Sequence, residues 1–76
     1  MTQMKIRLTA INDVKEFVDI AGRCNYDIDI TVGKYVVDAK SIMGLFSLDL
    51  SKELTLDAHT DDAKDLAEKI EKFIVK

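Results

Sequence analysis

Lys40 to Leu50 read KSIMGLFSLDL, a short run in which large apolar residues crowd around one glycine. The run predicts a short helix that begins near Ile42. Ser41 is its expected N-cap, because a serine hydroxyl accepts a hydrogen bond from the unpaired N–H groups of the first turn. So short a helix cannot turn every apolar side chain toward one core, and we expect Leu45 and Leu48 to point inward. The outward set consists of Ile42, Met43 and Phe46.

The segments on either side of this helix have the pattern of strands. Residues 26–32 (YDIDITV) alternate apolar and polar side chains, Gly33-Lys34 is a two-residue turn, and residues 35–39 (YVVDA) return. Alternation with a period of two is typical of a half-buried strand, and a glycine in a two-residue turn favours a hairpin. Residues 53–58 (ELTLDA) alternate again and predict a fourth strand.

The N-terminal part changes its period once. Residues 4–10 (MKIRLTA) alternate as a strand, and from Asn12 the apolar residues follow helical spacing. Asn12 or Asp13 is the expected N-cap of this helix, which Gly22 ends. Its apolar face consists of Val14, Phe17, Val18 and Ala21.

A last helix is predicted after the fourth strand. Thr60 is its expected N-cap, with Asp61 and Asp62 in the first turn and Lys72 and Lys76 in the last, signs that complement the helix dipole. Its apolar stripe consists of Ala63, Leu66, Ala67, Ile70, Phe73 and Ile74.

The element order is therefore β-α-β-β-α-β-α, and the predicted fold class is α+β. Four short, largely antiparallel strands with three helices on one face form an open-faced β-sandwich. The chain contains no proline, no linker and no internal repeat, so we expect residues 1–76 to form a single domain.

Composition excludes several functions. The formal net charge of −3 gives no basis for binding nucleic acid or an anionic membrane. No apolar run approaches the length that crosses a membrane, and the N-terminus is too polar for a signal peptide. Cys24 is the only cysteine, which fits the reducing cytoplasm.

The segment Lys40-Ser41-Ile42-Met43-Gly44, followed by Ser47-Leu48, resembles the regulatory segment of HPr, the small phosphocarrier of the bacterial sugar phosphotransferase system. Chain length, element order and the glycine-containing hairpin turn resemble the same family, especially its low-GC Gram-positive forms. The resemblance implies an HPr-like fold and a regulatory serine at Ser41.

One departure from the family concerns its chemistry. HPr proteins carry a Gly-Leu/Ile-His-x-Arg-Pro-Ala motif between the first strand and first helix, whereas this chain reads TAINDVKEFVDIAG. We expect about five residues to be deleted there, so that the strand enters the helix tightly at 11–13. Lys15 cannot replace the histidine, because a protonated amine is no nucleophile. The expectation is a protein that is not an enzyme and needs no cofactor or metal.

Other candidates have simpler explanations. His59, the only histidine, could be a non-standard phosphoacceptor, but three nearby aspartates would repel phosphate, and an exposed loop histidine is the simpler interpretation. Cys24 is expected to be a half-buried filler. The aspartates near the last helix lack the spacing of a calcium loop, so no metal site is predicted.

Ser41 keeps two interpretations, a helix N-cap and a phosphorylation site for an HPr kinase/phosphorylase. Phosphate at a helix N-terminus would change surface charge while preserving the fold. Ile42, Met43 and Phe46 beside it are expected to form a docking surface for a protein partner. The family resemblance implies that this partner is that kinase, the enzyme that delivers phosphate, or a LacI-type regulator. The alternatives are that these residues cover the sheet edge, that the chain is a phosphocarrier using His59, or that it is a scaffold retaining only the fold.

Overall fold

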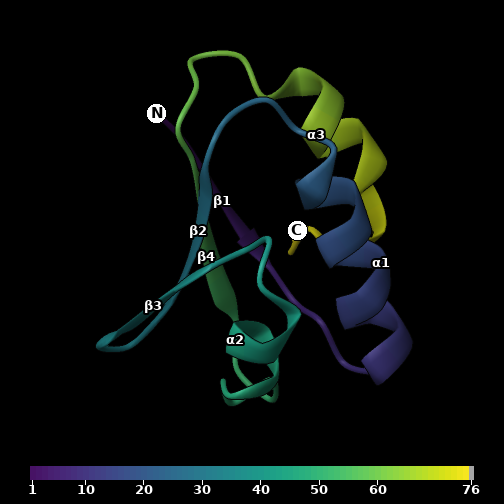
Figure 1. Cartoon of the computed structure of the whole chain (residues 1–76), viewed down its shortest axis with the longest axis vertical. Helices are drawn as coiled ribbons and strands as arrows, with labels where there is room; N and C mark the ends of the chain where they lie inside the picture. The colour runs from purple at the N-terminus through teal and green to yellow at the C-terminus, as the bar shows by residue number, and fades with distance from the viewer. Residues whose placement is uncertain (76) are drawn as a thin grey trace.

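The structure is a computed structural model that describes residues 1–75, and its elements follow the predicted order. They are β1 (Thr2–Ile6), α1 (Ile11–Gly22), β2 (Ile28–Val32), β3 (Tyr35–Asp38), α2 (Ile42–Phe46), β4 (Leu54–Ala58), α3 (Lys64–Lys69) and a 3₁₀ helix, η1 (Glu71–Phe73). Figure 1 shows α1 and α3 stacked against one side of the sheet, with α2 below them. The predicted α+β open-faced sandwich is confirmed.

The sheet has the strand order β1-β4-β2-β3, and every neighbouring pair is antiparallel. Apolar side chains of alternate residues point toward the helices, as the period of two predicts. Ile28 and Ile30 of β2 and Leu54 and Leu56 of β4 are fully buried there. Phe17 of α1 packs into the same core and is also fully buried.

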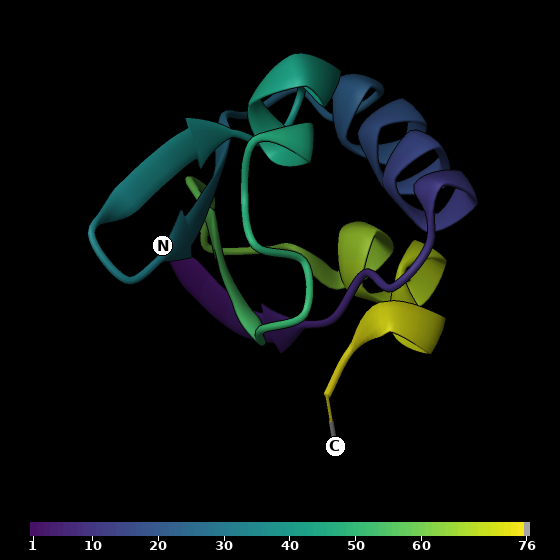
Figure 2. The ribbon, with the colours of Figure 1, turned by 90° about the horizontal axis from the view of Figure 1, so that it is seen from below.

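The two edges of this sheet differ. Beside β1, the N–H of Val75 donates to the carbonyl of Lys5 at 2.9 Å, and the N–H of Arg7 donates to the carbonyl of Phe73 at 2.8 Å. The last residues of the described chain therefore cover part of this edge. The opposite edge is β3, which has only β2 beside it (Figure 2).

The hairpin between β2 and β3 has the predicted turn. Val32 pairs with Tyr35, so Gly33 and Lys34 are the two turn residues. Gly33 has a φ of +59°, and no other described residue has a positive φ. A positive φ at the first central residue alone is the pattern of a type II′ turn, which requires glycine at that position.

The entry into α1 differs from the prediction. The helix begins at Ile11 with Ala10 at the N-cap, so neither Asn12 nor Asp13 occupies the N-cap position. The tight connection from β1 spans residues 7–10 and precedes the predicted 11–13 by a few residues. Lys15 is exposed as expected. The prediction placed the N-cap too late because Asp13 lies in the first turn of the helix, and its carboxylate accepts from the N–H of the preceding N-cap residue, Ala10. A carboxylate at either position can satisfy N–H groups at a helix start.

The C-terminal helix also starts later than predicted. α3 begins at Lys64 with Ala63 at its N-cap. Thr60 instead closes a turn before the helix, where its hydroxyl accepts from the N–H of Asp62 at 3.2 Å. The helix α3 ends at Lys69 with Ile70 at its C-cap, and η1 follows, while Lys76 lies outside the described residues. Its apolar stripe is nevertheless correct, since Leu66, Ile70 and Phe73 are buried.

Candidate functional site

The short helix α2 carries the serine that the sequence singled out. Ser41 has extended backbone angles (φ −104°, ψ 106°), and its Oγ accepts from the N–H of Gly44 at 3.2 Å. The predicted N-cap is therefore confirmed. Ser41 is half-buried, and its hydroxyl caps the first turn of α2.

Gly44 allows this helix to lie close to the sheet. A Cβ atom added at Gly44 would lie 3.3 Å from the Oγ of Ser41 and 3.3 Å from the Cβ of Val37. Both distances are tighter than ordinary packing, so the missing side chain sets how closely α2 approaches β3. The glycine thereby fixes the position of Ser41 relative to the sheet.

The apolar residues of α2 divide largely as expected. Leu45 is fully buried and Leu48 is half-buried against the core, whereas Met43 is 76% exposed and Phe46 is 40% exposed. Ile42 was expected to point mostly outward, but it is half-buried and packs against the core. Met43 and Phe46 are thus the exposed apolar residues of α2.

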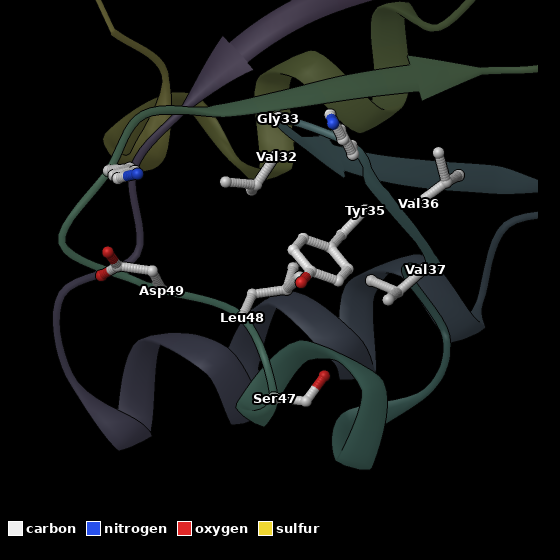
Figure 3. A pocket seen from close by; sticks show the side chains of 10 residues that line it. Val32, Gly33, Tyr35, Val36, Val37, Ser47, Leu48 and Asp49 are labelled. Atoms are coloured by element: carbon white, nitrogen blue, oxygen red, sulfur yellow. The ribbon is translucent and has the colours of Figure 1, made fainter.

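A groove of about 540 Å³ lies between the β2–β3 hairpin and the segment after α2. Figure 3 shows Tyr35 of β3 and Leu48 turned into this groove, with Val32 and Val37 on its wall and Asp49 at its rim. The sequence analysis missed this feature. Its signal was the YVV run of the third strand, in which Val36 is apolar at a position where alternation calls for a polar residue.

The N-terminus of α1 is occupied by the chain's own carboxylate. Oδ2 of Asp13 accepts from the N–H and the hydroxyl of Thr9, at 3.2 and 3.0 Å, and from the N–H of Ala10 at 3.3 Å. These hydrogen bonds, above all the one from the Thr9 backbone, lower the pKa of Asp13 below its ordinary value of 3.8. A negative charge is thus already present where a helix N-terminus would attract an anion.

His59 lies at the other end of the sheet. It follows Ala58, which pairs with Thr2 at the start of β1, whereas α1 begins after the end of β1. The rise of a strand puts roughly 13 Å between these two ends. Nε2 of His59 is 2.7 Å from Oδ2 of Asp29, and the side chain is 40% exposed. The expected exposed loop histidine is confirmed, with a hydrogen-bond partner, Asp29, that the sequence analysis did not identify.

Cys24 and Tyr26 form a small polar cluster at the end of α1. Cys24 is half-buried, as predicted, and its thiol donates to the carbonyl of Ile20 at 3.6 Å. Burial, together with the hydrogen bond and charge of the Cys24 side chain, raises the pKa of the Tyr26 phenol to about 12. Within residues 1–75, no three His, Cys, Asp or Glu side chains gather as a metal centre requires.

The structure defines a small open-faced α+β protein. Ser41 stands at the start of the short helix α2, and the candidate docking residues Met43 and Phe46 are exposed on that helix. No helix in the described chain has the length and apolar character needed to cross a membrane.

A family model described as "PTS HPr component phosphorylation site" matches residues 11–76. The chain belongs to the HPr family of the bacterial phosphotransferase system. Members of this family are phosphocarriers that work with other proteins of sugar transport and catabolite control. Among curated proteins, no significant sequence match is found.

Three solved structures are similar over nearly the whole chain. HPr-C-His from Thermoanaerobacter tengcongensis is 28% identical with a TM-score of 0.77, covering 95% of this chain and 89% of its own. The phosphocarrier protein HPr from Bacillus anthracis is 25% identical with a TM-score of 0.72, covering 97% and 96%. Crh, the catabolite repression protein of Bacillus subtilis, is 30% identical with a TM-score of 0.64, covering 100% and 93%, and forms a domain-swapped dimer.

Proposed function

We propose that this protein is a non-catalytic regulatory member of the HPr family that docks on other proteins through α2 and is switched by phosphorylation at Ser41. The observation that carries the proposal is the position of Ser41 at the N-terminus of α2, followed by the exposed side chains of Met43 and Phe46. A switchable charge next to exposed apolar side chains is typical of a regulated docking surface.

Phosphorylation at Ser41 is compatible with the fold. In the proposed step the Oγ attacks the γ-phosphorus of ATP, the hydroxyl proton passes to a base of the kinase, and ADP leaves. The new phosphate lies beside the N–H groups of the first turn of α2, where negative charge is favourable. The modification then changes the charge of the docking surface, and the helix persists.

Two observations support the absence of phosphohistidine chemistry. The carboxylate of Asp13 already occupies the N-terminus of α1, and like charges would repel an incoming phosphoryl group. The only histidine, His59, lies at the far end of the sheet with Asp29 against its Nε2. We therefore infer that neither position serves as a phosphoryl relay, and that the protein is not an enzyme.

The proposed partners are an HPr kinase/phosphorylase, which modifies Ser41, and a LacI-type regulator, which binds Met43 and Phe46 when Ser41 is phosphorylated. The similarity to Crh, a protein of catabolite repression, supports this assignment. Both partners act in the cytoplasm, where the free thiol of Cys24 stays reduced.

The modification is tested by incubating the protein with an HPr kinase and ATP, and by measuring intact mass. We expect one phosphate on the wild-type protein, none on Ser41→Ala, and one on Ser47→Ala. Ser47 is a matched control because it lies at the other end of α2 and its hydroxyl donates to the carbonyl of Gly44 at 2.6 Å. Phosphate on the Ser41→Ala variant would overturn the assignment of the site.

Histidine chemistry is tested separately with phosphoenolpyruvate and the general donor enzyme of the phosphotransferase system. We expect no acid-labile, base-stable label on this protein, while an HPr with its histidine loop is labelled in the same reaction. Stoichiometric label that disappears in the variant His59→Ala would favour the phosphocarrier alternative instead.

A further inference from the structure

We propose that the free edge of β3 is a self-association surface, at which two copies of this chain pair antiparallel and join their sheets. This inference is independent of the proposed role of Ser41, because it concerns the outer edge of β3 and uses no side chain of α2. It follows from the exposed main chain of β3, the side chains along it and their charges.

The main chain of β3 has unpaired groups on its outer side. In a two-residue hairpin the residues that flank the turn form a hydrogen-bonded pair, here Val32 and Tyr35, and every second pair along the ladder is the same kind. Tyr35 and Val37 therefore bond to β2, whereas the N–H and C=O groups of Val36 point away from the sheet. Such an edge is a template for another strand.

The side chains of this edge are more apolar than an edge usually allows. Tyr35 is 70% exposed and Val36 is 62% exposed, and they are neighbours in a strand that lacks the proline or bulge that protects many edges. The other edge is partly covered, because Val75 bonds to Lys5 beside β1. Only β3 thus offers an open strand of high β-propensity.

The sequence of the edge is complementary to itself. If a twofold axis passes between Val36 of one copy and Val36 of the other, Lys34 of each copy lies opposite Asp38 of its mate. In this register Val36 exchanges both main-chain hydrogen bonds with its mate, and Tyr35 of each copy packs beside Val37 of the other. Val37 lines the groove described above, so the tyrosine of the second copy lies at the rim of that groove.

A charge imbalance on the outer face favours this register. The residues Asp57, Asp29 and Asp38 lie in one row across β4, β2 and β3, and like charges opposite one another are unfavourable. Asp29 has His59 beside it and Asp57 accepts from Gln3. The carboxylate of Asp38 accepts from the main-chain N–H of Lys40, and among residues 1–75 no cationic side chain pairs with it. Lys34 of the second copy would place an ammonium group at this unbalanced end of the row.

The occupant is therefore a second copy of the chain, and the pairing of so few residues predicts a weak dimer. Sedimentation equilibrium between roughly 10 µM and roughly 1 mM at low salt should show a monomer–dimer equilibrium with a high-micromolar Kd. A protein that stays monomeric throughout this range would overturn the proposal and leave the edge open to an extended peptide of another protein.

Charge exchange tests the register. Lys34→Asp and Asp38→Lys should each raise the Kd about tenfold or more, because each places two like-charged pairs in the symmetric dimer. An equimolar mixture of these two variants should form a heterodimer, since opposite charges again face each other. The control is Lys15→Asp, which makes the same charge change at an exposed residue of α1, and its Kd should equal that of the wild-type protein. If the Kd does not change in the Lys34 and Asp38 variants, the dimer uses another contact, such as exchange of β1, and the proposed surface is wrong.

A cross-link tests the same register without changing charge. In a hydrogen-bonded antiparallel pair the two Cα atoms are about 5.5 Å apart, which a disulfide can bridge. In a Cys24→Ala background, Val36→Cys should oxidise to a covalent dimer. Thr31→Cys, on the same face of neighbouring β2, should remain monomeric under the same conditions. Equal cross-linking of both cysteines would exclude the proposed pairing.

Discussion

Single side chains set the ends of the helices in this protein. Ser41 caps α2 with its hydroxyl, whereas Ala10 cannot cap α1, and Asp13 performs that task from inside the helix. Both arrangements satisfy N–H groups that a helix start leaves unpaired. They differ in charge, because a serine leaves its helix end neutral and open to phosphate, while an aspartate makes its end negative. The two helix ends are therefore suited to different chemistry.

Replacing Ser41 tests the cap. Ser41→Ala should lower the free energy of unfolding by about 1 kcal/mol, because the N–H of Gly44 loses its acceptor. Ser41→Asp should nearly preserve stability, since a carboxylate caps well and suits the positive end of the helix. Urea denaturation measures both, with Ser47→Ala as the control. A Ser41→Asp variant less stable than Ser41→Ala would contradict the view that negative charge is tolerated there.

Tyr26 makes a pH-dependent contribution to stability. Its pKa is raised from 10.0 to about 12 in the folded protein, so between these values the folded state keeps a proton that the unfolded state has lost. The contribution of Tyr26 is intact below pH 10 and is lost as the pH rises through about 12. In the variant Tyr26→Phe, the free energy of unfolding, measured by urea denaturation at a series of pH values, should fall less between pH 10 and about 12.

Tyr35→Phe is the matched control, because it removes an equivalent hydroxyl from a side chain that is 70% exposed and leaves Tyr26 in place. The free energy of unfolding of this control should fall above pH 10 as much as that of the wild-type protein. If Tyr26→Phe and the wild-type protein lose stability in parallel above pH 10, the loss originates elsewhere.

Among the helices, α2 is only shallowly packed. It has five residues, and only Leu45 is fully buried. A helix of this length gains little from its own hydrogen bonds, so its cap and its contact with β3 hold it in place. Because Gly44 lies against Val37, the element that carries the proposed docking residues is held against the sheet, while Met43 and Phe46 stay exposed.

Truncation of Phe46 tests how α2 divides its side chains. Phe46 is 40% exposed, so Phe46→Ala should cost about 1–2 kcal/mol of unfolding free energy, whereas Phe17→Ala in the core should cost about 3–5 kcal/mol. Met43→Ala, at a side chain 76% exposed, should change stability by less than about 0.5 kcal/mol. A loss for Phe46→Ala equal to that for Phe17→Ala would place the ring in the core and remove it from the docking surface.

Over the whole molecule, the sheet separates two kinds of surface. One face is buried under the helices, and the other is a polar layer in which Gln3 bonds Asp57 and Lys5 bonds Thr55. The row of Asp57, Asp29 and Asp38 crosses three neighbouring strands on this outer face. The face that contributes nothing to the core thus carries a concentrated negative charge.

Neutralising one member of this row should stabilise the protein. Asp57→Asn keeps an oxygen that can accept from Gln3 and removes one carboxylate charge, so it should raise unfolding free energy by about 0.5 kcal/mol at low salt. The gain should shrink in concentrated salt, because screening weakens the repulsion in the wild-type protein. Asp27→Asn, an equal charge change outside the row, should gain less. A gain that is independent of salt would show that repulsion is not its cause.

The sequence was sufficient for the features that depend on local pattern. The alternation of residues 26–32, the glycine of the turn and the spacing of Val14 and Phe17 predicted the strands, the hairpin and the helix face, because burial of one face imposes these periods. The cap at Ser41 was likewise predictable, since serine is a preferred N-cap residue and stands directly before the apolar run of α2.

Tertiary packing decided the remaining features. The half-burial of Ile42, the pairing of His59 with Asp29 and the alignment of three aspartates all join residues distant in the chain. Their positions depend on strand register and on how closely α2 approaches the sheet. Local periodicity cannot specify these distances, because the same alternating pattern is compatible with several strand orders. The open edge at β3 is also of this kind, since only the strand order leaves it without a neighbour.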